Sequence, residues 1–238
     1  MLIQIAGVHD LDEAELIIAA GATHIGLPLR LPDGREDLSE SDARALVRAI
    51  AGRIETVLIT YQTDPDDILK FAAWLGVTGV QLHGAVSEAT VARLRELESR
   101  VFLLQSLVVQ GERVQDGPGQ DGPVPRGEVQ GDNLRALLQT ASRCAPYVDA
   151  FITDTYDPRT GRRGATGLTH DWSVSATLVQ LIDRPIILAG GITPANVADA
   201  VRVVRPAGVD AHTGVEDPRT GRKCPERLRA FVEGAWVA

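Results

Sequence analysis

Three short glycine-containing segments have the composition of an anion-binding surface. In chain order they are Gly164-Ala165-Thr166-Gly167, Gly190-Gly191 and Thr213-Gly214-Val215, and they come after the last three of the eight aliphatic runs described below. Where side chains are absent, backbone N–H groups can approach an oxyanion closely, and a nearby helix dipole adds to the attraction. We therefore predict a phosphate site made by these residues: Gly164, Thr166, Gly167, Gly190, Gly191, Thr213 and Gly214.

The overall composition excludes several other kinds of partner. The 238 residues carry a formal net charge of -8, which argues against nucleic-acid or membrane binding, so an anion site must be a local concentration of donors. The two cysteines, Cys144 and Cys224, have neither metal-ligand spacing nor the number needed for a disulfide framework. No signal peptide or membrane span is recognisable. We expect a cytoplasmic protein, monomer or homodimer, that needs no metal or cofactor and binds a phosphorylated small molecule.

Eight short aliphatic runs are predicted to be the strands that position these loops. Each is short and rich in aliphatic residues, and four of them are followed directly by Gly or Thr, as is typical of buried parallel strands. The runs are Leu2–Ala6, His24–Pro28, Thr56–Tyr61, Gly79–Leu82, Val101–Leu107, Asp149–Asp154, Pro185–Ala189 and Gly208–His212.

Helical patterns lie between the strands, with start signals at Asp10, Ser39, Asp64-Pro65 and Thr193-Pro194. Eight strand–helix units in 238 residues predict a single-domain (β/α)8 TIM barrel over residues 1–238. A doubly wound open sheet is the alternative. In the barrel, phosphate often binds at the loops after the seventh and eighth strands, where two of the glycine segments fall.

Two segments interrupt this rhythm. Residues 110–132 are rich in Gly and Pro and read as a mobile loop after the fifth strand, either a lid over the barrel mouth or an insertion without a role. The hexapeptide Asp-Pro-Arg-Thr-Gly-Arg occurs at 157–162 and again at 217–222. It is either a pair of similar β-turns or a pair of arginine-bearing loops at the entrance for an anionic substrate.

Several longer strings match one known pattern nearly from end to end. They are Gly21-Ala22-Thr23-His24-Ile25-Gly26, Val80-Gln81-Leu82-His83-Gly84, Asp154-Thr155, Gly164-Ala165-Thr166-Gly167 with Asp171-Trp172, Leu188-Ala189-Gly190-Gly191-Ile192 with Pro194 and Asn196, and Val209-Asp210 with Gly214-Val215-Glu216. In these strings the chain resembles phosphoribosylanthranilate isomerase, the barrel enzyme of tryptophan biosynthesis that performs an Amadori rearrangement.

The resemblance implies an acid and a base. In the family, a carboxylic acid ending the sixth strand protonates the furanose ring oxygen and opens the ring, and Asp154 matches that position. A cysteine ending the first strand then removes the proton from C2 of the Schiff base. Here the family's Lys-Ile-Cys-Gly is Gln4-Ile5-Ala6-Gly7, so the catalytic cysteine is absent and the chain is a divergent member.

Two histidines could replace the missing base. His9 lies two residues past Gly7, and His212 ends the eighth strand, which neighbours the first in a closed barrel. Imidazole has an ordinary pKa near 6.5, which suits proton abstraction at neutral pH. Alternatively, His9 is a solvated residue in the first turn of a helix, and His212 is a hydrogen-bonded histidine at the rim of the barrel. From the resemblance, Arg35 is expected to meet the aglycone carboxylate. His83 belongs to a family string and is either a structural residue or a substrate contact.

The function expected is therefore an aldose–ketose isomerase of the phosphoribosylanthranilate isomerase type with an altered base. Its substrate is phosphoribosylanthranilate or a phosphorylated sugar–amine conjugate with a different aglycone. One alternative is a non-catalytic phosphometabolite-binding protein. The other is a lyase on the same barrel, for which the two lysines, Lys70 and Lys223, fall outside the strands.

Overall fold

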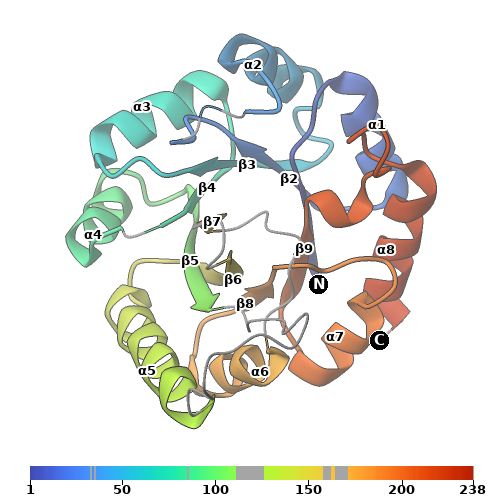
Figure 1. The fold of residues 1–238 in the computed structure, drawn as a ribbon. Helices are drawn as coiled ribbons and strands as arrows, with labels where there is room; N and C mark the ends of the chain where they lie inside the picture. Colours follow the sequence, from blue (N-terminus) through green and yellow to red (C-terminus); the bar gives the residue numbers. More distant parts are fainter. Residues whose placement is uncertain are drawn as a thin grey trace.

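The computed structural model describes residues 1–32, 34, 36–84, 86–110, 126–157, 162–163 and 171–237. Its strands form a closed parallel barrel inside a ring of helices (Figure 1). The strand order is β5-β4-β3-β2-β1-β9-β8-β6, and pairing of β5 with β6 closes the cylinder. The (β/α)8 barrel prediction is confirmed, and the open-sheet alternative is wrong because an open sheet leaves its outer strands unpaired.

The elements follow the strand–helix alternation that the sequence predicts. The strands are β1 Leu2–Ala6, β2 His24–Pro28, β3 Glu55–Thr60, β4 Gly79–Leu82, β5 Phe102–Gln110, β6 Ala150–Asp157, β8 Ile186–Leu188 and β9 Gly208–Ala211, with the short β7 Arg162–Arg163 antiparallel to β6. The helices are α1 Leu11–Ala20, α2 Glu40–Ala49, α3 Pro65–Leu75, α4 Glu88–Leu97, α5 Arg126–Cys144, α6 Trp172–Leu181, α7 Val197–Val204 and α8 Pro225–Val237, with the 3-10 turn η1 at Thr213–Val215.

Three of the predicted helix starts are confirmed by their caps. Asp10, Ser39 and Asp64 each accept a hydrogen bond from the backbone N–H three residues further on, which satisfies a donor that the helix itself leaves free. Pro65 occupies the first turn of α3, where its missing N–H costs nothing. These local signals fix where the chain turns away from the barrel mouth.

The fourth predicted helix start is wrong. Thr193-Pro194 does not open α7, which begins at Val197 after a turn. The Asn196 side chain holds that turn: its Oδ1 accepts from Thr193 N at 2.7 Å and its Nδ2 donates to Gly191 O at 3.0 Å. A side chain that fastens the loop back onto Gly191 therefore outweighs the usual preference for Pro at a helix start.

The predicted loop at 110–132 also needs corrected bounds. Gln110 still belongs to β5, and residues 126–132 belong to α5. Residues 111–125 lie outside the described residues. The prediction that the loop is mobile stays a prediction.

The barrel strands separate two apolar layers because their side chains alternate between its inside and its outside. The larger layer packs the strands against the helices. The smaller one fills the barrel interior and consists of Val57, Leu104, Ala150, Ile152, Ile187 and Ala189. Among the described residues, no helix is long and apolar enough to cross a membrane.

Candidate active site

Asp154 lies near the carboxyl end of β6, where catalytic groups of such barrels are placed. Its Oδ2 is 3.1 Å from His83 Nε2, and His83 Nδ1 is 2.9 Å from Ser106 Oγ. Its Oδ1 accepts a hydrogen bond from Thr155 N at 2.7 Å. Burial raises the pKa of Asp154 against the opposing effects of His83 and the Thr155 N–H. The arrangement holds a carboxyl that is easier to keep protonated than a surface aspartate.

His83 was expected to be either a structural residue or a substrate contact, and the structure places it against Asp154. Its side chain is 5% exposed, and its ring packs edge-on against Tyr61 at 4.7 Å between centroids. An imidazole fixed at both nitrogens can orient the Asp154 carboxyl. The position therefore suits a residue that acts through Asp154.

A second carboxyl, that of Asp210, lies in the same row on the inner wall. Ile152 pairs with Ile187, and Ile187 with Gly208. Two residues further along each strand, Asp154 and Asp210 stand on either side of the small Ala189. Asp210 belongs to one of the family strings, but it is not among the site residues predicted from the sequence.

Asp210 is bound by glutamine rather than by a cation. Gln4 Nε2 donates to Asp210 Oδ1 at 2.9 Å and to Gln81 Oε1 at 2.9 Å. Burial, as the largest cause, and the charge of Asp154 raise the pKa of Asp210 to about 7, although the Gln4 hydrogen bond and Lys223 lower it. Near pH 7 this carboxyl is therefore present in both protonation states.

The raised pKa of Asp210 predicts a pH-dependent stability. Between about pH 4 and pH 7 the folded protein holds a proton that the unfolded chain has released, so this group's contribution to stability falls as pH rises. One pKa unit corresponds to about 1.4 kcal/mol. Asp210→Asn should therefore flatten the fall of the melting temperature between pH 5 and pH 8, whereas Asp183→Asn, at an exposed aspartate, should not. Parallel pH profiles for Asp210→Asn and the unmodified chain would contradict this.

The two histidines proposed as bases meet at the mouth, where both face Asp37. His9 Nε2 is 3.8 Å from Asp37 Oδ1, and His212 Nε2 is 3.7 Å from Asp37 Oδ2. His9 Nδ1 is 3.1 Å from Glu13 Oε2, so Glu13 orients its ring. His9 was alternatively expected to be a solvated residue in the first turn of a helix. It is partly exposed, but it precedes α1 and is held by Glu13.

His212 covers the end of β1, beside the position of the missing cysteine. A Cβ added at Gly7 would lie 1.9 Å from His212 Nε2, so only glycine leaves room for this ring. Burial, followed by the charges of Lys223 and His9, lowers the pKa of His212 to about 3. The ring is therefore neutral at pH 7 and a weak base.

Lys223, which lies outside the strands as expected, is nevertheless buried at this mouth. Its ammonium donates to Glu216 Oε1 at 2.7 Å and to the His212 carbonyl at 3.1 Å, and its backbone N–H donates to Glu13 Oε1 at 2.9 Å. Burial lowers the pKa of Lys223, opposed by Glu216. The sequence could not reveal the contact between Lys223 and Glu13, because the two residues are 210 positions apart.

The second copy of the repeated hexapeptide is a turn. Asp217 N donates to Arg222 O, and Arg219 binds the Asp217 carboxylate. Arg222 contacts Asp10 and lies 2.6 Å from Glu13. Both arginines are thus engaged by carboxylates. Residues 158–161 of the first copy lie outside the described residues.

The predicted phosphate loops after β8 and β9 approach one another closely. A Cβ at Gly214 would lie 2.1 Å from the Ile192 carbonyl oxygen, so the backbones of the two loops touch there. The Gly191 carbonyl accepts from Asn196, and the Gly214 carbonyl accepts from Arg227 Nη2 at 2.8 Å. In a trans peptide the next N–H points the opposite way, so the N–H groups of Ile192 and Val215 point away from these partners.

Four predicted site residues lie outside the described residues: Gly164, Thr166, Gly167 and Arg35. Gly190, Gly191, Thr213 and Gly214 lie where the barrel prediction placed them, after β8 and β9. Among the described residues, no group of three or more His, Cys, Asp or Glu side chains could hold a metal ion.

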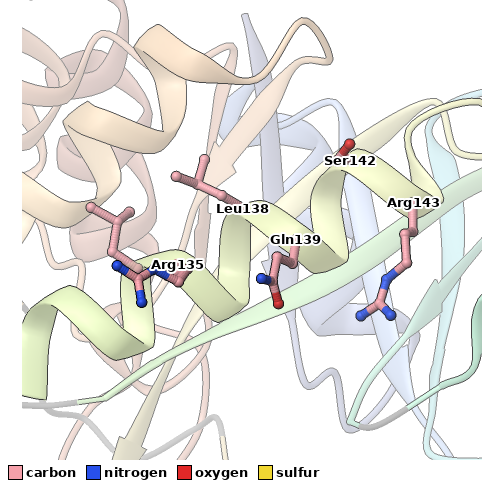
Figure 2. Close-up of a pocket in the computed structure, with 6 residues that line it drawn as sticks. Arg135, Leu138, Gln139, Ser142 and Arg143 are labelled. Atoms are coloured by element: carbon pink, nitrogen blue, oxygen red, sulfur yellow. The ribbon is translucent and has the colours of Figure 1, made fainter.

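A pocket of about 650 Å³ lies elsewhere, on the outer surface of α5. Figure 2 shows its lining side chains, which come from this one helix: Leu134, Arg135, Leu138, Gln139, Ser142 and Arg143. Barrel active sites instead gather residues from several strand ends. This surface depression is therefore not the candidate active site.

Comparison with known proteins identifies the family. The family model for "N-(5'phosphoribosyl)anthranilate (PRA) isomerase" matches residues 129–234. N-(5'-phosphoribosyl)anthranilate isomerase 2 of Methanosarcina mazei is 33% identical over 99% of this chain and 94% of its own length.

Solved structures show the same fold. The phosphoribosyl anthranilate isomerase of Thermotoga maritima superposes with a TM-score of 0.77 at 24% identity, with both chains fully covered. A further isomerase structure, in complex with reduced 1-(o-carboxyphenylamino)-1-deoxyribulose 5-phosphate, has a TM-score of 0.75 at 22% identity, again over both full chains. The chain therefore belongs to the phosphoribosylanthranilate isomerase family, a family of intramolecular oxidoreductases that convert aldoses to ketoses.

Proposed function

We propose that this chain rearranges a phosphorylated sugar or sugar–amine conjugate from aldose to ketose by Amadori chemistry. The observation that carries the proposal is the buried Asp154 carboxyl in the carboxyl-terminal half of β6, with a raised pKa and an orienting His83. A carboxyl that keeps its proton can donate it to the furanose ring oxygen and so open the ring. Membership of the isomerase family supports the same reaction.

The phosphate would bind at the loops after β8 and β9, with Gly190, Gly191, Thr213 and Gly214. Backbone N–H groups can hold a dianion there although the whole chain is acidic. The close approach of Gly214 to Ile192 supports a shared cradle formed by both loops. Gly164, Thr166, Gly167 and Arg35 stay predictions.

The described side chains at the other end of the pocket favour an aglycone that differs from anthranilate. His9 and His212 surround Asp37, and Glu216 lies 3.6 Å from His212. Lys223 is already paired with Glu216. An anthranilate carboxylate at this wall would therefore meet carboxylates, so a neutral conjugate belongs in the first assays.

The direct test is steady-state turnover. We expect the purified chain to consume phosphoribosylanthranilate, followed by the loss of anthranilate fluorescence, or a phosphoribosyl conjugate of aniline, which lacks the carboxylate, followed by chromatography. Turnover of the aniline conjugate alone would assign a different aglycone. Absence of turnover of both at high enzyme concentration would refute the proposed rearrangement.

Gly214→Ala tests the phosphate cradle. The new methyl group must push the two loops apart, so we expect KM to rise about tenfold or more with a smaller change in kcat. Gly52→Ala is the control for general destabilisation: its Cβ meets open space between α2 and β3, but its φ of +75° strains the backbone, so it should lower stability and leave KM unchanged. An unchanged KM in Gly214→Ala would place the phosphate elsewhere.

Ala6 favours a second candidate function, a phosphometabolite-binding protein without turnover. Its methyl group cannot accept a proton. In that case Asp154→Asn would leave the affinity for reduced 1-(o-carboxyphenylamino)-1-deoxyribulose 5-phosphate nearly unchanged, and no product would form from any conjugate. A lyase is less favoured, because the ammonium of Lys223 is already bound by Glu216.

The assembly and the compartment stay predictions. A related structure describes the isomerase of Thermotoga maritima as dimeric. We propose that this chain is either a monomer or a homodimer and that it lies in the cytoplasm. Sedimentation of the purified chain would decide its oligomeric state.

A further inference from the structure

We propose that Asp210 is the base that removes the proton from C2 in this chain, in place of the cysteine that Ala6 replaces. The inference rests on the proposed function and names a catalytic residue for it. It follows from the position of Asp210 in the barrel, its partial exposure to solvent and its hydrogen-bond partners.

The position of Asp210 is set by the strand register. Gln4 of β1 pairs with Asp210 of β9, and Ala6 is the next residue of β1 that faces the same side of the barrel wall. On the other side, Ala189 alone separates Asp210 from Asp154 within the row. An acid and a base two strands apart could thus act on one sugar lying between them.

Asp210 is partly exposed to solvent. It keeps intermediate solvent exposure although Val209 and Ala211, its neighbours in the strand, are buried. Ala6 and Ala189 beside it are small. Ala6 lacks the sulfur atom that a cysteine would place at this position, so less side chain stands beside the carboxylate.

The partners of Asp210 leave it free to take up a proton. Gln4 stands where the family has lysine, so the hydrogen bond to Asp210 carries no positive charge. Among the charged groups that act on the carboxyl, Lys223 lowers its pKa, and Asp154 raises it in the ionised form that is left after the ring oxygen has been protonated. Together with burial they bring the pKa to about 7, close to the pH at which a base must work.

The proton transfer can be written without any additional reactant. Asp154 protonates the ring oxygen, and the C1–O bond breaks to give the open-chain Schiff base. Asp210 takes the proton from C2, the C2–H electron pair forms the C1=C2 double bond, and the C1=N electrons move to nitrogen. The resulting enol becomes the C2 ketone when its hydroxyl loses a proton and C1 gains one. Atoms and electrons balance within the isomerisation.

The two mouth histidines are weaker candidates for this step. Burial leaves His212 with a pKa of about 3, so its imidazole accepts protons poorly. His9 has Nδ1 directed at Glu13 and Nε2 directed at Asp37. Both are nevertheless included in the test as rival bases.

The experiment combines Asp210→Asn with Ala6→Cys. Asparagine has the same shape and can still accept from Gln4, so we expect a folded variant whose kcat/KM falls by about 10²–10⁴. Adding Ala6→Cys to Asp210→Asn should recover at least about tenfold of that loss, because it returns a thiol to the vacant position. The rising limb of kcat/KM against pH, expected near pH 7 in the unmodified chain, should move in the double variant.

Several outcomes would overturn the proposal. Activity within a few-fold of the unmodified chain in Asp210→Asn, with a large loss in His9→Gln or His212→Gln, would assign the base to that histidine. An inactive unmodified chain whose Ala6→Cys variant is active would show that the pocket suits the reaction but that Asp210 does not serve it. Failure of both chains on both conjugates would instead refute the proposed function itself.

Discussion

Asp154→Asn is expected to lower kcat/KM for the isomerisation by about 10²–10⁴, the usual contribution of a general acid. The carboxyl is buried between His83 and the Thr155 N–H, and burial raises its pKa. Asparagine can still accept from Thr155 with Oδ1, so the fold and the pocket should persist. What disappears is the proton that the furanose oxygen must receive.

Asp149→Asn is the matched control for this prediction. Asp149 lies just before β6, at the opposite end of the barrel, and accepts from Arg95 Nη2 at 2.6 Å and from Leu103 N at 2.7 Å. The same substitution there should lower the melting temperature and leave kcat unchanged in the folded protein. The role of Asp154 as the acid would be refuted if Asp154→Asn kept kcat/KM within a few-fold of the unmodified chain.

The strands and most helix starts could be predicted because their causes are local. A side chain such as Ser39 caps the helix that begins at the next residue, and an aliphatic run such as Gly79–Leu82 predicts a buried strand wherever it lies. The start of α7 could not be predicted in the same way, since the Asn196 side chain reaches back to Gly191 and decides it through loop geometry.

The site residues also differ in whether local sequence or the folded structure reveals them. Asp154 could be predicted because it matches a family string. The proposed role of Asp210 as a base depends on contacts between strands that are far apart in the sequence. Gln4 and Asp210 are 206 positions apart, and the charge of Asp154 reaches Asp210 across β8. A signal was present, in that Asp210 interrupts an apolar strand at a position facing the barrel interior, but its protonation depends on the assembled wall.

Two differences between β1 and the family pattern both affect the surroundings of Asp210. Lysine-to-glutamine at position 4 removes a charge that would hold Asp210 ionised, and cysteine-to-alanine at position 6 removes the family's thiol from the same face of β1. Either change alone would weaken the family mechanism. Together they leave a carboxyl of suitable proton affinity close to the place of the lost thiol, which is why we infer relocation of the base rather than its loss.

Lys223→Met is expected to destabilise the fold by about 3 kcal/mol or more, the usual cost of removing one partner of a buried ion pair. The Lys223 side chain has no exposed surface, and its ammonium is 2.7 Å from Glu216, which is 13% exposed. Without the lysine, Glu216 keeps a negative charge near Asp37 and Glu13 with no cation to offset it. The affected segment joins β9 to α8, so its loosening should also disturb His212 at the mouth.

The only other lysine in the chain, Lys70, supplies the control. It is exposed on α3, and Lys70→Met should change the free energy of unfolding by less than about 0.5 kcal/mol. Adding Glu216→Gln to Lys223→Met should restore part of the loss, because the stranded carboxylate is removed with its partner. Urea unfolding measures the free energy of unfolding of the unmodified chain, of the two single lysine variants and of the double variant. If Lys223→Met and Lys70→Met unfolded at the same denaturant concentration, the Lys223–Glu216 pair would not fasten the segment between β9 and α8, and His212 would owe its place over Gly7 to packing alone.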